Sequence, residues 1–112
     1  MGSSDRGVNP GELAVDVAGA DGHYEVRLRG ELDMSTAAQL RDELQRLATE
    51  EAPKVTVDLS GLAFVDSTGL SVLITGLKRF RQLGGDMALR SPSSGTLRVL
   101  EITGLTEVFA IT

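Results

Sequence analysis

The stretch "FVDSTGL", residues 64–70, decides the fold because two kinds of hydrophobic pattern meet there. Before it, Val55, Val57 and Leu59 occupy alternate positions, which predicts a strand at residues 54–59. After it, apolar residues recur at helical spacing, which predicts an amphipathic helix with a stripe made of Leu70, Leu73, Ile74, Leu77 and Phe80. We therefore expect a strand-to-helix junction here, with Ser67 at the N-cap or in the first turn.

Two strands and a helix are expected before this junction. The segments "ELAVDVAG" (residues 12–19) and "HYEVRLRGELD" (residues 23–33) alternate apolar and polar residues, which is typical of half-buried strands. Asp21-Gly22 between them favours a tight hairpin, so the two strands are predicted to be antiparallel. In residues 35–52 a helix is predicted, with Thr36 and Gln39 fitting a capping box or Ser35 as an alternative cap.

A short strand, a helix and a final apolar run follow the junction. We expect a strand at residues 86–90, then a helix capped by Ser93 or Ser94, and then a run at residues 107–111 that fits a strand or a helix start. Strands that alternate with helices predict an α/β fold: a mixed sheet of four to five strands, with three or more helices mainly on one face. The strand at 54–59 has few polar alternates and is expected to be central and covered on both faces.

The chain is expected to be one domain, residues 12–112, after a disordered tail at residues 1–11 that is partly a cloning remnant. The net charge of −5 argues against nucleic acid and against a membrane surface as partners. No run approaches the length of a membrane span, and no signal peptide is recognisable, so a cytoplasmic protein is expected.

The sequence offers little for catalysis. It contains no Cys and a single histidine, His23, which falls beside the predicted hairpin and far along the chain from Ser67. The G-x-S-x-G pattern, the phosphate-binding loop and metal-ligand spacings are all missing from the sequence. We therefore predict no enzymatic activity, no metal and no cofactor.

Ser67 has two interpretations on the residues alone. Serine is a favoured helix N-cap, worth about 1 kcal/mol, which would make the residue purely structural. A hydroxyl exposed at a helix N-terminus is also accessible to a kinase, and a phosphate there would add about −1.5 to −2 charges beside Asp66. Asp33 follows another strand, so if the two strands are parallel neighbours, Asp33 and Ser67 share one surface; Asp33 could equally serve as a cap.

Three segments together resemble STAS domains, and most of all the bacterial anti-sigma factor antagonists, also called anti-anti-sigma factors. They are "RGELDMSTA" (residues 29–37), "VDLSGLAFVDSTGL" (residues 57–70) and "LGGDMALRSPSSGTLRVLEITGLTEVF" (residues 83–109). The Asp-Ser-Thr-Gly-Leu string in this context is the most specific part. The family commonly continues into a C-terminal helix after the last strand, whereas this sequence ends at Thr112.

The resemblance implies partner switching in transcription regulation, as in stress response or sporulation. Ser67 would be phosphorylated by a cognate anti-sigma factor that is an ATP-dependent serine kinase, and a serine phosphatase would reverse this. The unphosphorylated form would bind the anti-sigma factor as a monomer or weak dimer, with no cofactor of its own. The partner-binding residues implied are Asp33, Met34, Ser35, Asp66, Thr68, Gly69 and Leu70. The alternative is a STAS module that only docks, in a transport or stress-signalling complex.

Overall fold

The computed structural model describes residues 8–112, which form five strands, three α-helices and one short 3₁₀ helix. The order of strands and helices agrees with the sequence prediction. The elements are β1 (Leu13–Ala20), β2 (His23–Leu32), α1 (Ala37–Leu47), β3 (Lys54–Val65), α2 (Ser67–Gln82), β4 (Asp86–Arg90), α3 (Ser94–Ile102), η1 (Leu105–Glu107) and β5 (Ala110–Ile111).

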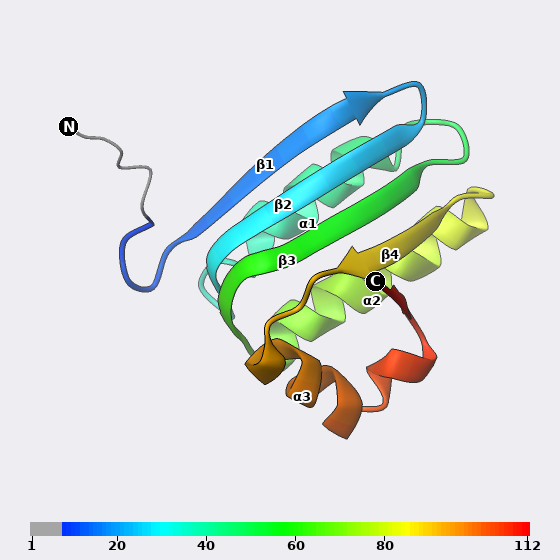
Figure 1. Cartoon of the computed structure of the whole chain (residues 1–112). Coiled ribbons are helices and arrows are strands. Elements are labelled where there is room, and N and C mark those ends of the chain that lie inside the picture. Colours follow the sequence, from blue (N-terminus) through cyan, green and yellow to red (C-terminus); the bar gives the residue numbers. More distant parts are fainter. Residues whose placement is uncertain (1–7) are drawn as a thin grey trace.

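The strands form one mixed sheet in the order β1-β2-β3-β4-β5 (Figure 1). β1 is antiparallel to β2, whereas the pairs β2–β3, β3–β4 and β4–β5 are parallel. The predicted hairpin is confirmed, because Asp21 and Gly22 both have positive φ, 56° and 82°. Parallel neighbours place the carboxyl ends of β2 and β3, and the helices that follow them, at the same edge of the sheet.

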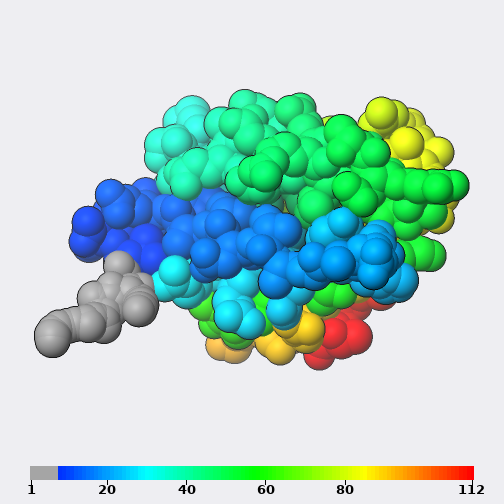
Figure 2. All heavy atoms as spheres, turned by 90° about the horizontal axis from the view of Figure 1, so that it is seen from above, coloured from blue at the N-terminus to red at the C-terminus, as the bar shows by residue number. Residues whose placement is uncertain are grey.

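One hydrophobic core joins the sheet to the helices, and α1 and α2 lie side by side behind the sheet in Figure 1. The predicted apolar stripe of α2 is largely buried, and α1 buries Ala37, Leu40, Leu44 and Leu47. In α2 only Ile74 is partly exposed, because it lies at the margin of the stripe. The fully buried side chains include Val26, Leu28, Leu40, Val57, Leu59, Leu73, Leu77 and Phe80. Figure 2, which looks onto β1, shows α1 in cyan to green against one side of this edge strand.

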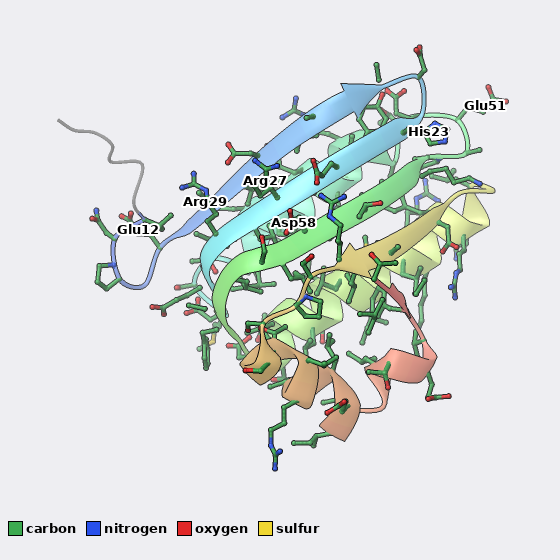
Figure 3. All side chains as sticks on the ribbon, viewed as in Figure 1. Glu12, His23, Arg27, Arg29, Glu51 and Asp58 are labelled. Carbon is green, nitrogen blue, oxygen red and sulfur yellow. The ribbon has the colours of Figure 1, made fainter. Side chains whose placement is uncertain are left out.

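The other face of the central strands carries charged side chains (Figure 3). Arg27, Asp58 and Arg90 are register partners across β2, β3 and β4. Asp58 is only 8% exposed and pairs with both arginines, at 3.8 Å and 3.3 Å. A hydrogen bond from the Ser60 backbone N–H, helped by the charge of Arg27, lowers the pKa of Asp58. β3 is therefore central, as expected, but on this face it is covered by ion pairs at Asp58.

The structure corrects one local detail of the sequence prediction, the helix cap before α1. The capping box of Thr36 and Gln39 is wrong, because the Gln39 amide donates to the Leu13 carbonyl at 2.9 Å instead of reaching back to the cap. The final apolar run forms the end of η1 and the short strand β5. Residues 1–7 of the expected tail lie outside the described residues. In the rest of that segment, the Gly11 N–H donates to the Glu31 carboxylate.

Gly69 allows α2 to approach β2 closely. A Cβ at this position would lie 2.6 Å from Leu32 Cγ and 3.0 Å from the Leu32 carbonyl oxygen. The residue is buried, so neither neighbour has room to move away. Gly69 therefore serves helix–strand packing, and its role is not confined to easing the turn.

We predict that Gly69→Ala lowers the free energy of unfolding by about 1–3 kcal/mol, the usual cost of overpacking. The matched control is Gly95→Ala in the first turn of α3, where an added Cβ meets nothing within 4 Å. The control is expected to stabilise slightly, because Ala favours a helix more than Gly does. Urea denaturation followed by circular dichroism measures both; equal stability of the two variants contradicts the packing argument.

Candidate functional site

The two strand-to-helix junctions lie next to each other, as expected from the sequence. Leu32 and Val65 are the last register partners of β2 and β3, and the Asp66 N–H donates to the Leu32 carbonyl at 3.1 Å. Figure 1 shows both strands leading into their helices at the lower left of the molecule. The residues that follow Leu32 and Val65 therefore form one continuous region.

Asp66 joins the two junctions through its carboxylate. One oxygen accepts the Gly69 N–H at 2.9 Å and so caps α2, and the other accepts the Met34 N–H at 3.1 Å. Ser67 is consequently the first residue of the helix and not its cap. The structural interpretation of Ser67 as an N-cap is thus wrong, because Asp66 already fills that role.

Asp33 organises the turn that leads into α1. Its Oδ1 accepts hydrogen bonds from the Ser35 hydroxyl at 2.8 Å, from the Ser35 N–H at 3.0 Å and from the Thr36 N–H at 3.2 Å. The Ser35 hydroxyl is the largest cause that lowers the pKa of Asp33, and the two N–H groups act in the same direction. Thr36 itself turns inward, where its hydroxyl donates to the Glu31 carbonyl at 2.8 Å. Asp33 therefore stays ionised while it holds this loop.

We name the resulting region the junction surface and define it by the residues Asp33, Met34, Ser35, Asp66, Ser67 and Thr68. Met34 is 79% exposed, Ser35, Ser67 and Thr68 are exposed, and the two aspartates are half-buried. Gly69 and Leu70, which the family resemblance also implies as partner-binding residues, are buried beneath it. These two residues can support the surface, but in this structure they do not offer a side chain to a partner.

Phe64 is an exposed neighbour that the sequence analysis did not include. It is 50% exposed and pairs in register with Glu31, just before the junction. The sequence signal is the run Ala63-Phe64-Val65, in which the strict alternation of β3 breaks down. Register shifts between β2 and β3 in this region accompany that break, and Phe64 is left outside the core while Val65 is buried.

The single histidine of the sequence does not lie near Ser67. His23 pairs with Lys54 at one end of β2, whereas Leu32 and the junction lie at the other end. His23 is exposed, and its ring contacts the Asp21 carbonyl at 3.4 Å. Within residues 8–112, no group of three or more metal-ligating side chains could hold a metal ion. None of the helices in that range is long and apolar enough to span a membrane.

The fold and the site define a small α/β domain that displays hydroxyl and carboxylate groups on a rigid pair of strand-to-helix junctions. The chain belongs to the STAS domain family, whose model matches residues 14–112. It is 33% identical over 99 residues to the anti-sigma-B factor antagonist of Bacillus subtilis, covering 88% of this chain and 90% of that protein.

Solved structures agree with this assignment. The crystal structure of an anti-sigma factor antagonist from Mycobacterium paratuberculosis has a TM-score of 0.79 and 27% identity, covering 88% of this chain and 84% of that one. The unphosphorylated form of the anti-sigma factor antagonist SpoIIAA shares the fold, with a TM-score of 0.76, 22% identity and 88% coverage of both chains. The expected STAS-like mixed sheet is thereby confirmed.

We predict that Asp66→Ala lowers the free energy of unfolding by about 2 kcal/mol, since it removes a helix cap and a second hydrogen bond. Ser93→Ala in α3 is the matched control, because the Ser93 hydroxyl accepts only one capping N–H, from Thr96. The control is expected to cost about 1 kcal/mol. Hydrogen exchange adds a second measurement: the Met34 amide exchanges faster in Asp66→Ala only. An unchanged Met34 amide contradicts the bridging role.

We predict that Ser35→Ala raises the pKa of Asp33 back toward its ordinary value of 3.8, because the variant removes the main hydrogen bond to the carboxylate. A carboxyl group whose pKa is lower in the folded state stabilises the protein at pH values above its ordinary pKa. This contribution is lost as the pH falls through the pKa of the folded state. The wild type should therefore lose more stability than Ser35→Ala below about pH 4. Carboxyl NMR titration measures the pKa, with Asp58 as the internal control that stays unchanged.

Proposed function

We propose that this protein is an anti-sigma factor antagonist that works by partner switching, with Ser67 as the phosphorylated residue. The unphosphorylated protein binds an anti-sigma factor in the cytoplasm and thereby releases a sigma factor. That anti-sigma factor is also the ATP-dependent serine kinase, and a serine phosphatase restores the binding form. The relatives named anti-sigma-B factor antagonist support the role, and the exposed hydroxyl of Ser67 on the junction surface is the observation that carries the switch.

Phosphorylation at Ser67 is compatible with an intact fold. The Ser67 hydroxyl makes no hydrogen bond within residues 8–112, so its modification breaks no internal contact. As the first residue of α2, Ser67 lies at the positive end of the helix dipole, where a phosphate is tolerated. Asp66 already occupies the Gly69 N–H, however, so the helix offers a phosphate fewer free donors than an uncapped N-terminus would.

The same phosphate disrupts docking. It adds about −1.5 to −2 charges to a surface that already carries the carboxylates of Asp33 and Asp66. The apolar side chains of Met34 and Phe64 are 79% and 50% exposed, so a partner can cover both. Such a partner buries the added charge at the edge of an apolar contact. An unpaired charge in an interface costs several kcal/mol of binding free energy. Each loss of about 1.4 kcal/mol lowers the affinity tenfold. The charge thus weakens binding without unfolding the protein.

The second candidate is a STAS module that docks without phosphorylation in a transport or stress-signalling complex. The exposed apolar pair Met34 and Phe64 favours docking in either case. The two functions differ in how binding responds to charge at Ser67. For the first, the protein is expected to act as a monomer or weak dimer that exchanges partners.

We predict that Ser67→Asp weakens binding to the cognate anti-sigma factor at least tenfold, whereas Ser67→Ala binds like the wild type and is not phosphorylated. The matched control is Ser94→Asp, because Ser94 is the exposed first residue of α3 and receives the same charge at an equivalent helix position. This control is expected to bind normally. Calorimetric titration measures affinity, and mass mapping after incubation with the kinase, ATP and magnesium locates the phosphate.

Each result bears on the proposal. A phosphate mapped to Ser67, together with selective loss of binding in Ser67→Asp, supports partner switching. Binding that tolerates both Ser67 variants supports the docking module instead. A phosphate on another residue, with Ser67 unmodified, contradicts the assignment of the site.

A further inference from the structure

A second concave site lies on the outside of the helix pair, between α1 and α2. It is a groove of about 560 Å³, within the range of pockets that hold small molecules. Most of it lies away from the junction surface, with only Thr68 belonging to both. Its lining residues come from the two helices and from the start of the loop after α1: Arg41, Leu44, Gln45, Ala48, Thr49, Thr68, Ser71, Val72, Thr75, Gly76, Arg79 and Phe80.

The floor of the groove is apolar. Leu44 and Phe80 are buried core residues that reach it from below, and Val72 and Ala48 are half-buried along its length. Gly76 contributes only backbone, and an added Cβ there would lie 2.9 Å from Leu44 Cδ1. Phe80 is fully buried, so the groove presents no aromatic face on which a nucleobase could stack. A flexible aliphatic chain suits this floor better than a flat ring does.

The rim carries two arginines with no acidic partner. Within the described residues, Arg41 of α1 and Arg79 of α2 form no ion pair, as is also true of Arg98 in α3, whereas the other described arginines do. Both guanidinium groups are exposed on a protein with a net charge of −5. Unpaired arginines beside an apolar groove favour an anionic ligand, because a guanidinium group binds a carboxylate through two parallel hydrogen bonds.

The two arginines lie toward opposite ends of the groove. α1 and α2 follow neighbouring parallel strands and therefore run in the same direction. Arg41 and Thr68 belong to the N-terminal parts of their helices, whereas Arg79 and Thr49 lie near the C-terminal ends. The hydroxyls of Thr68 and Ser71, which line the groove at the Arg41 end, are further hydrogen-bond donors for an anionic headgroup.

We propose that this groove binds a medium-chain fatty acid, with its carboxylate at Arg41 and its alkyl chain along Val72 and Ala48 toward Arg79. The carboxylate pairs with Arg41, and the aliphatic stem of Arg79 covers the far end of the chain. An acidic peptide fits less well, because its several carboxylates would meet only two cationic side chains, Arg41 and Arg79, among the residues that line the groove. The proposal does not depend on phosphorylation of Ser67.

The experiment titrates the full chain with decanoate below its micelle concentration, followed by amide NMR and calorimetry. Saturable binding with shifts at Thr68, Val72 and Gly76 is expected, and 1-decanol should bind at least tenfold more weakly because it lacks the charge. Arg41→Gln should weaken decanoate binding at least tenfold. Lys78→Gln is the matched control: it removes one charge from α2 outside the groove and should leave binding unchanged.

Thr75→Phe provides an independent test, since it fills the groove from an exposed position and is expected to abolish binding while circular dichroism stays native. If Thr75→Phe fails to fold, the effect of Arg41→Gln on decanoate affinity alone decides whether the proposal holds. Absence of saturable decanoate binding overturns the proposal. So does equal affinity for decanoate and 1-decanol, or equal weakening by Arg41→Gln and Lys78→Gln. Binding of an acidic helical peptide in the groove, with none of decanoate, also overturns it.

Discussion

The structure of the functional region depends on one carboxylate. Asp66 accepts a hydrogen bond from the backbone of its own helix, at Gly69, and another from the neighbouring junction, at Met34. A single side chain thereby fixes both the start of α2 and the turn before α1. Because Asp66 supplies the cap, Ser67 is not needed as a cap, and it lies exposed as the first residue of α2, as the proposed phosphorylation requires.

Closely packed and hydrogen-bonded residues support the exposed junction surface from below. Gly69 packs against Leu32 beneath the surface, and Asp33 tightens its own turn with three hydrogen bonds to one oxygen. Added charge at Ser67 therefore meets a scaffold that has little freedom to rearrange. In the proposed switch, its effect would therefore fall on docking, with stability left unchanged.

The periodic parts of the fold were predictable from sequence, and the single contacts were not. The alternation of Val55, Val57 and Leu59 and the helical stripe that begins at Leu70 predicted β3 and α2, and parallel pairing brought Asp33 and Ser67 to one edge. The sequence did not reveal which residue caps α2, because Asp and Ser are both favoured caps. Only the geometry at the end of β3 determines that Asp66 is the cap. Phe64 was missed because the run Ala63-Phe64-Val65 signals only that the alternation breaks down, and not which residue the register shifts leave outside the core.

The groove between α1 and α2 also could not be predicted from the sequence. Each helix by itself looks amphipathic, with Arg41 and Arg79 on ordinary solvent-facing positions. Only the parallel packing of the two helices places these cations along one apolar floor and brings Thr68 to the point where the groove meets the junction surface. A ligand in the groove and a partner on the junction surface would then both touch the first turn of α2. If both proposals hold, Thr68 is the point of contact through which a fatty acid in the groove would alter the docking of a protein.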